Sequence, residues 1–226
     1  MIKSIDSIYE EIRNKIIYLE LPPNTKIREE DLAEEYKISR TPVRGIISRL
    51  VQDKLLMVAP QKGTFVTRIN IKEIHDYIFI RKSVELAVIK IVAEVATDED
   101  LDALMAILDE QKTIATQEPS IEKSIAFYKT DNEFHRLMFK IAGEENVWNL
   151  VIGGVTPLNR ARIMANLRDS ERVMAVYEQH RKIVDMLKAK DNEAAIKAYD
   201  EHLDRGFDGL NPVIEQYKDY FVGGEN

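Results

Sequence analysis

Apolar residues recur every three or four positions along most of the chain, and this period predicts helices. In the first third, helices are predicted over about 5–19, 29–36 and 39–53. Two β-prone runs follow, LLMV at 55–58 and TFVTRI at 64–69, on either side of APQKG. A turn that contains Pro and Gly between two such runs is typical of a β-hairpin. Three helices followed by a hairpin are the layout of a winged helix-turn-helix.

From residue 71 onward the pattern is helical, and no strand is predicted. Helices are expected over 71–96, 98–117, 121–141, 145–165, 171–189 and 192–210, with Asp, Ser and Thr as caps at the breaks. Six or seven such helices predict an antiparallel all-α bundle. We therefore expect a mostly α chain with a winged helix-turn-helix over 1–70 and a helical bundle over 71–226, which ends in a frayed tail at 223–226.

Composition and charge narrow the classes of protein that remain. Of the 226 residues, 45% are hydrophobic and 31% charged, as in soluble globular proteins, and no apolar run approaches the roughly 20 residues that span a bilayer. The absence of cysteine excludes disulfides and thiolate metal ligands. The net charge of −7 is uneven, because residues 1–70 hold 12 Lys and Arg against 10 Asp and Glu. This uneven charge suggests two domains with different partners. The lack of cysteine fits a cytoplasmic protein, and the lack of a long apolar run predicts no membrane partner.

The third predicted helix carries polar side chains that suit DNA recognition. On a helical wheel Thr41 and Arg44 lie opposite the apolar face, and Arg40 lies at the N-terminal edge. The N-terminal end of a recognition helix meets base edges in the major groove, where arginine can donate two hydrogen bonds to guanine. Ser39 is the expected N-cap, and Gly63 marks the tip of the wing. The alternative is that the two arginines are merely solvated surface charges.

Three of the four histidines fall on the inward faces of predicted helices. His135 follows Asp131 by one helical turn, and His180 and His202 lie on two later helices. An isolated buried ionisable group is costly. These side chains therefore either form hydrogen bonds within the core or converge on a metal ion. A set of one Asp and three His suits zinc, which we expect first, or nickel, manganese or iron, rather than calcium or magnesium.

Two stretches carry a resemblance to a known family. IREEDLAEEYKISRTPVRGIISRL at 27–50 and QKGTFV at 61–66 resemble the DNA-binding domain of GntR-family transcription regulators. The helical remainder is similar to the FCD-type domain of the FadR branch. The resemblance implies a bacterial regulator, in most cases a repressor, that binds double-stranded operator DNA as a homodimer and responds to a small organic acid.

The resemblance also implies roles for particular residues. It implies DNA contacts at Ser39, Arg40, Thr41, Arg44 and Gly63, and divalent metal ligands at Asp131, His135, His180 and His202. Arg81 resembles a family arginine that reaches the effector carboxylate, and we expect it to bind the effector.

The sequence departs from the family pattern at several positions. Asn24 and Lys54 stand where glycine is common, and Gly45 stands where glutamate is common in the recognition helix. Glu30 occupies a position where some members carry a DNA-contacting arginine. Glycine within a helix costs roughly 0.5–1 kcal/mol relative to alanine. We therefore expect a recognition helix that frays more than usual.

Three other functions fit parts of the sequence. One is a regulator of the same fold that binds no metal and senses a fatty acyl or other apolar ligand. The second is a metal-dependent hydrolase, since a metal with an open position can activate water. The third is an architectural DNA-binding protein with a closed, apolar bundle interior. No HExxH motif and no evident general base is present, so we expect no enzyme.

Overall fold

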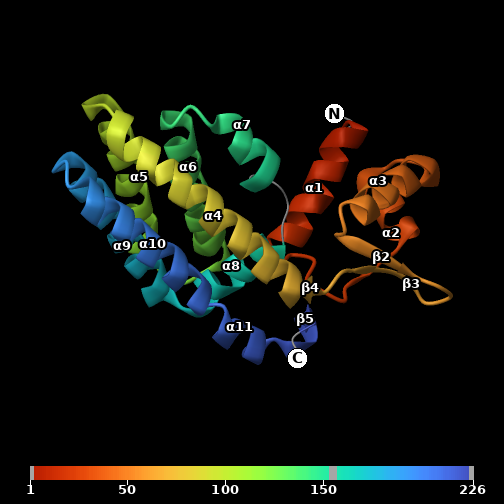
Figure 1. The fold of residues 1–226 in the computed structure, drawn as a ribbon. Coiled ribbons are helices and arrows are strands. Elements are labelled where there is room, and N and C mark those ends of the chain that lie inside the picture. Colours follow the sequence, from red (N-terminus) through yellow and green to blue (C-terminus); the bar gives the residue numbers. More distant parts are fainter. Residues whose placement is uncertain (1–2, 153–156, 224–226) are drawn as a thin grey trace. The chain divides into compact units, whose positions relative to one another are not determined.

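The computed structural model describes residues 3–152 and 157–223, which fall into two compact units (Figure 1). The first unit joins residues 1–71 to residues 217–226, and the second contains residues 72–216. The sequence placed residues 217–226 with the helical domain, so their association with the first unit was not foreseen.

The elements of the first unit follow the winged helix-turn-helix order. They are α1 (Ile5–Ile17), β1 (Lys26–Ile27), α2 (Glu29–Tyr36), α3 (Arg40–Gln52), β2 (Leu56–Ala59), β3 (Gly63–Val66) and β4 (Ile69–Asn70). The antiparallel sheet has the order β1-β3-β2, with Leu56 opposite Val66 and Ala59 opposite Gly63. The predicted apolar stripes form its core, where Ile16, Ile46 and Leu50 are fully buried. Each such side chain contributes about 1.5–3 kcal/mol of stabilisation by leaving water.

A short parallel pair of strands brings the end of the chain to the first unit. β5 (Phe221–Val222) pairs with β4, with Ile69 opposite Phe221 and Asn70 opposite Val222. The 3-10 helix η2 (Lys218–Tyr220) precedes β5, and Asn24 Nδ2 donates a hydrogen bond of 2.9 Å to the Asp219 carbonyl. The prediction of no strand after residue 71 is therefore wrong, because a two-residue strand leaves no periodic signal. Of the expected tail at 223–226, residues 224–226 lie outside the described residues.

Two of the departures from the family pattern adopt left-handed backbone conformations. Asn24 has φ +71° and Lys54 has φ +58°. At the end of α3, the Lys54 N–H donates to the Val51 carbonyl at 3.0 Å and the Leu55 N–H donates to the Leu50 carbonyl at 2.8 Å. A lysine therefore terminates the helix in the conformation that glycine adopts without steric cost. Gly45 lies within α3, which is continuous from Arg40 to Gln52.

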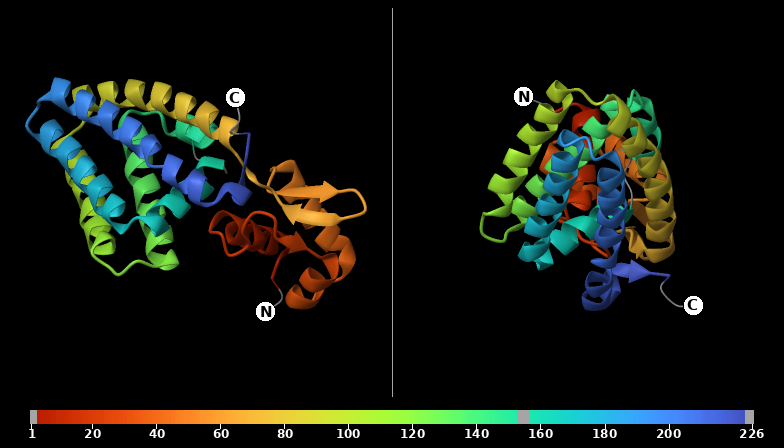
Figure 2. Two further views of the ribbon diagram at one scale, coloured as in Figure 1. Left: turned by 90° about the horizontal axis from the view of Figure 1, so that it is seen from below. Right: turned by 60° about the vertical axis from the view of Figure 1, so that its left-hand side comes forward.

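The second unit is a bundle of antiparallel helices (Figures 1 and 2). Its longer helices are α4 (Ile71–Val95), α5 (Asp98–Ala115), α6 (Ile121–Ile141), α8 (Pro157–Arg168), α9 (Ser170–Lys188) and α10 (Asn192–Asp208). A short α11 (Asn211–Gln216) follows α10. Helix α9 packs against α5 and α10, and α6 packs against α5 and α8. The predicted fold class, mostly α with an N-terminal winged helix-turn-helix and a helical bundle, is confirmed.

One predicted helix is interrupted. A single helix was expected over 145–165, but α7 covers only Glu145–Val147 and is followed by a π-helical turn, η1 (Trp148–Ile152). The next helix begins at Pro157. Proline has no N–H and fits best in the first turn of a helix, so it favours a new helix at this point. The prediction of a continuous helix was wrong because apolar spacing alone does not register this signal.

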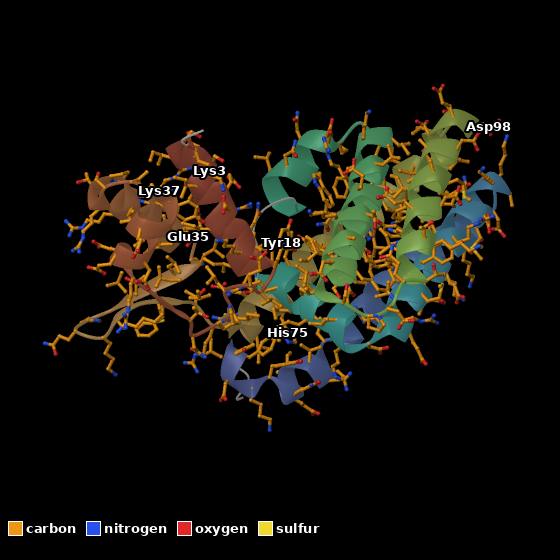
Figure 3. All side chains as sticks on the ribbon, turned by 180° about the vertical axis from the view of Figure 1, so that it is seen from behind. Lys3, Tyr18, Glu35, Lys37, His75 and Asp98 are labelled. Carbon is orange, nitrogen blue, oxygen red and sulfur yellow. The ribbon has the colours of Figure 1, made fainter. Side chains whose placement is uncertain are left out.

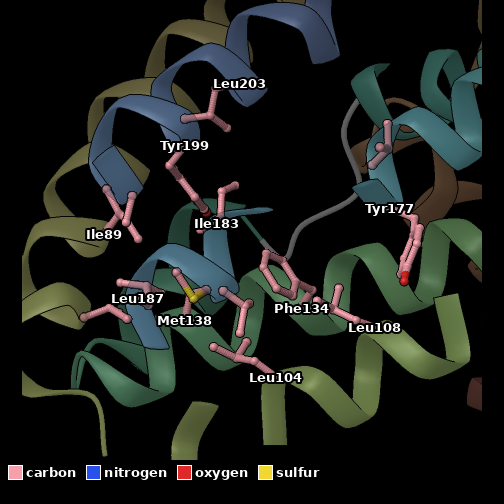
Figure 4. Close-up of a cluster of buried hydrophobic side chains, with 14 of the residues drawn as sticks. Ile89, Leu104, Leu108, Phe134, Met138, Tyr177, Ile183, Leu187, Tyr199 and Leu203 are labelled. Carbon is pink, nitrogen blue, oxygen red and sulfur yellow. The ribbon is translucent and has the colours of Figure 1, made fainter. Parts of the chain in front are cut away.

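Buried apolar side chains from five helices make the core of the bundle (Figure 4). Leu104, Leu108, Phe134, Met138 and Ile183 have no exposed surface. Several of the expected caps are present: Thr97 forms a capping box at the start of α5, and the Ser120 hydroxyl accepts the Lys123 N–H at the start of α6. Within residues 3–152 and 157–223, none of the helices combines the length and hydrophobicity that a bilayer crossing requires.

Candidate functional site

Three histidines from three helices meet in the centre of the bundle. His135 comes from α6, His180 from α9 and His202 from α10, and all three are buried. The Nε2 atoms of His180 and His202 are 3.2 Å apart, and those of His202 and His135 are 3.5 Å apart. Each histidine contributes one ring nitrogen to a group in which all atoms lie within 4.8 Å of one another. The predicted convergence of these three histidines is therefore present.

The other ring nitrogen of each histidine is held by an oxygen. Nδ1 of His180 lies 3.0 Å from Gln111 Oε1, and Nδ1 of His202 lies 2.9 Å from Gln179 Oε1. Because an amide oxygen can only accept, each Nδ1 carries the proton, and in a neutral ring the Nε2 lone pair is then free. The Nε2 atoms of His180 and His202 therefore face each other as acceptors, an arrangement that a cation between them would stabilise.

This geometry fits a metal ion. Zinc binds histidine nitrogen at about 2.0–2.1 Å, which in a tetrahedral site separates two nitrogens by about 3.4 Å. Burial and the charge of neighbouring histidines lower the pKa of His202 to about 3 and hold the pKa of His180 well below its usual value. Both rings are therefore neutral at physiological pH, which is the form that binds metals.

Asp131 lies beside the histidines but is paired with an arginine. Its Oδ2 is 3.8 Å from His135 Nε2, and its Oδ1 is 3.8 Å from His180 Nε2. Arg162 of α8 forms an ion pair with the same carboxylate and also donates a hydrogen bond of 3.0 Å to Asn132 Oδ1. Burial opposes ionisation of Asp131, but the charge of Arg162 outweighs it and holds the Asp131 pKa below its ordinary value. Asp131 is therefore an anionic candidate metal ligand beside the cluster.

A fully buried carboxylate orients His135. Glu85 of α4 accepts from His135 Nδ1 at 2.8 Å and from the Tyr199 hydroxyl at 2.7 Å through Oε2, and its Oε1 is ion-paired with Arg81. Burial opposes ionisation of Glu85, but the charge of Arg81 and the hydrogen bond from His135 hold its pKa below the ordinary value. A carboxylate behind a ligating histidine fixes the ring and raises its basicity.

A small cavity of about 40 Å³ opens beside the cluster. Its walls include His135, His202 and Asp131 together with three arginines, and these arginines are Arg81, Arg162 and Arg172. Arg81, expected from the sequence to meet an effector, is buried there and ion-paired with Glu85. Positive side chains dominate this wall, so the cavity favours an anion that is only a few times larger than a water molecule.

The residues expected to contact DNA lie on the first unit. Ser39, Arg40, Thr41 and Arg44 are exposed at the N-terminal end of α3. Ser39 takes the N-cap position, although its hydroxyl makes no capping hydrogen bond. Gly63 begins β3 with φ +120°, directly after the turn of the wing.

Arg40 and Arg44 of the recognition helix are each ion-paired with a carboxylate of α2. Arg40 Nη1 lies 3.0 Å from Glu30 Oε1, and Arg44 Nε lies 2.9 Å from Glu29 Oε2. His75, labelled in Figure 3, is by contrast exposed near the start of α4. The histidine cluster does not include it.

Two residues of the site were missed by reasoning from the sequence. Glu85 and Gln111 lie on buried helix faces, and neither was proposed as a site residue. Glu85 follows Arg81 by four residues on the apolar face of α4, and Gln111 interrupts an apolar stripe of α5. A polar side chain within a buried stripe is the signal that could have identified both.

Comparison with known proteins matches a protein family to each of the two units. The family described as "Bacterial regulatory proteins, gntR family" matches residues 4–66, and the family described as "FCD domain" matches residues 76–205. The chain is 26% identical to the HTH-type transcriptional repressor RspR of Escherichia coli (strain K12) over 214 residues, 95% of this chain and 92% of that protein. It is 30% identical over 221 residues to an HTH-type transcriptional regulator in an unstable DNA locus of Streptomyces ambofaciens. This match covers 95% of this chain and 88% of that protein.

Solved structures share the fold. McbR/YncC of E. coli aligns with a TM-score of 0.68 at 20% identity, over 96% of this chain and all of that one. A putative GntR transcriptional regulator from Rhodococcus sp. RHA1 aligns with a TM-score of 0.70 at 21% identity, over 94% of this chain and 98% of that one.

Proposed function

The chain belongs to the GntR family of bacterial regulators, with an FCD domain, and from this premise we propose a repressor controlled by a metal-bound small carboxylate. The chain is a DNA-binding transcription regulator. The family and the relatives are regulators, so the metal-dependent hydrolase is not supported. The observation that carries the proposal is the meeting of ring nitrogens from three buried histidines beside an arginine-lined cavity.

On the DNA side, we assign base contacts to Arg40 and Arg44 and phosphate contacts to Ser39 and Thr41. The exposure of all four side chains supports this assignment, while the opposite face of α3 is buried in the unit. Gly63 lets the backbone of the wing turn sharply at the position expected to approach the duplex.

The regulator is proposed to act as a homodimer, with one recognition helix per operator half-site. Helix α4 supports this proposal, because four of its large apolar side chains are exposed: Phe79 (74%), Ile80 (37%), Ile91 (36%) and Val95 (51%). The repressor role is supported by the relative RspR, which is named a transcriptional repressor.

In the bundle, His135, His180, His202 and Asp131 are proposed to hold a divalent transition metal, zinc first and nickel, manganese or iron otherwise. The ion would stabilise the facing lone pairs and offer its remaining positions to a carboxylate. Glu85, Gln111 and Gln179 hold the Nδ1 protons and so point the three Nε2 atoms inward.

The effector is proposed to be a small organic acid. Arg81, Arg162 and Arg172 carry one positive charge more than Asp131 and the Glu85 that is ion-paired with Arg81. A fatty acyl or other extended apolar ligand would need a long apolar channel, whereas this cavity is small and has charged walls. The same polar interior argues against an architectural protein with a closed apolar bundle. Binding would change DNA affinity only if the acid favours one arrangement of the regulator over another.

Two experiments test the proposal. In the first, metal is quantified in protein purified without an affinity metal column, for the wild type and Asp131→Ala. We expect about one ion per chain in the wild type and a loss in the variant, and equal amounts or no metal would refute the metal site. In the second, Arg44→Ala and a control, Arg136→Ala at an exposed arginine of α6, are compared for operator preference. Only Arg44→Ala should remove the preference, at about 1–3 kcal/mol per lost guanine contact.

A further inference from the structure

The two arginines that we assign to base contacts each form an ion pair with a carboxylate of the same unit. Helix α2 places Glu29 and Glu30 in its first turn, opposite the first turns of α3. Glu30 pairs with Arg40, and Glu29 pairs with Arg44 through the guanidinium Nε. Neither arginine is therefore a free cation on the surface that faces DNA.

These ion pairs are exposed, so they are weak and exchangeable. The Arg40 and Glu30 side chains are 59% and 57% exposed, and those of Arg44 and Glu29 are 67% and 34% exposed. An ion pair of this kind favours the paired state by a factor of about 1.4 to 5. Two hydrogen bonds from one arginine to guanine discriminate by a factor of about 5 to 150. A correctly placed guanine can therefore displace the carboxylate.

We propose that Glu29 and Glu30 are specificity-determining residues, which hold Arg40 and Arg44 until the major groove presents guanine. This inference rests on the proposed base-reading role of the two arginines. On DNA of unrelated sequence, the arginines gain only phosphate contacts, and the carboxylates beside them repel the same phosphates. The ion pairs then persist, and the arginines release few counterions. Glu29 and Glu30 thus weaken binding to unrelated DNA more than binding to the operator.

The proposal predicts a measurable change in salt dependence. Each arginine freed from its carboxylate can neutralise one more phosphate, which steepens the slope of log K against log salt by about 0.9 on unrelated DNA. Removing a carboxylate also removes a repulsive charge near the backbone. Both changes raise affinity for unrelated DNA, and the ratio of operator affinity to unrelated affinity falls.

The test uses the full chain with Glu29→Gln, Glu30→Gln and the double substitution. The probes are a duplex selected in vitro with the wild-type protein and a duplex of random sequence, with binding measured from 50 to 200 mM salt. We expect the double variant to bind the random duplex about three- to tenfold more tightly, with a steeper slope, and the selected duplex to gain less. Thermal melting establishes that each variant is folded.

Glu34→Gln is the matched control. It removes the same charge from the same helix at an exposed position, and Glu34 is not in either ion pair. Random-duplex binding and salt slopes that equal those of the wild type in all three variants would overturn the inference, and so would an equal gain in Glu34→Gln.

Arg40→Ala and Arg44→Ala separate this inference from the proposed function. If they abolish the preference for the selected duplex while the glutamate variants change nothing, only the role of the glutamates fails. A preference that survives both arginine substitutions would overturn the recognition-helix assignment and this inference with it.

Discussion

His180 and His202 face each other through Nε2 atoms 3.2 Å apart, and each is oriented from behind by a glutamine oxygen. Two neutral imidazoles in this orientation have no proton to share, so their contact is unfavourable without a cation. The two helices that carry them, α9 and α10, pack directly against each other. A bound ion would therefore stabilise the packing of these helices as well as the site.

Zinc is expected to raise the midpoint of thermal unfolding of the metal-free protein. A ligand that binds only the native state adds about 2.7 kcal/mol at one hundred times its dissociation constant. His202→Gln should lose most of this gain because one donor of the cluster is removed. The control is His75→Gln, at an exposed histidine outside the cluster, which should keep it. An equal zinc effect in both variants would show that the ion binds elsewhere.

Glu85→Gln is expected to weaken metal binding by about 10- to 100-fold, since Glu85 orients His135. It also leaves buried Arg81 without its carboxylate, which costs about 3–5 kcal/mol of stability. Metal affinity is therefore measured by chelator competition at a temperature where the variant is folded. Glu94→Gln, an exposed change on the same helix, should have no effect. A Glu85→Gln affinity within twofold of the wild type would contradict the orienting role.

Lys54→Gly is expected to stabilise the protein by about 1 kcal/mol. Lys54 ends α3 at φ +58°, a conformation that costs a residue with a Cβ about 1–2 kcal/mol and costs glycine much less. Lys54→Ala, which keeps the Cβ, serves as the control and should bring no gain. Urea denaturation measures both, and a gain for alanine equal to that for glycine would assign the effect to the lost charge.

Stability is expected to fall above pH 10 through Tyr9. Burial and the hydrogen bond that its hydroxyl donates to Asp53 raise the Tyr9 pKa to about 12. The unfolded chain loses this proton near pH 10, whereas the folded protein keeps it. Between pH 10 and 12 the free energy of unfolding therefore decreases as pH rises, by up to about 1.4 kcal/mol per pH unit. Denaturation measured from pH 9 to 11 should show that the free energy of unfolding decreases less steeply with pH in Tyr9→Phe than in the wild type. Identical slopes in the two proteins would contradict the prediction.

The helices and the inward faces of the histidines could be predicted because apolar spacing reports which face of a helix is buried. The same spacing does not report which helix covers that face. Tyr199 and Glu85 are hydrogen-bonded across 114 positions of sequence, and Asp131 and Arg162 are paired between two helices. Such partners depend on tertiary packing, so the network behind the histidines emerged only from the structure.

Local chemistry explains the remaining differences. The helix predicted over 145–165 was wrong because Pro157 favours a new helix start, a signal that outweighs apolar periodicity. Strand β5 is only two residues long and is defined by its partner β4, so nothing in its own sequence marks it. The ion pairs of Arg40 and Arg44 join two predicted helices through side chains, which a wheel of one helix cannot show.

The pairing of β4 with β5 makes the DNA-binding unit discontinuous in sequence. The helical segment 72–216 is inserted between two strands of that unit, like a domain placed within a loop. A fragment that stops at Asn70 would expose the edge of β4. It would also lose the Asp219 carbonyl, which accepts a hydrogen bond from Asn24 Nδ2. Dissection of the protein into independent halves therefore requires splicing 217–223 onto the N-terminal piece.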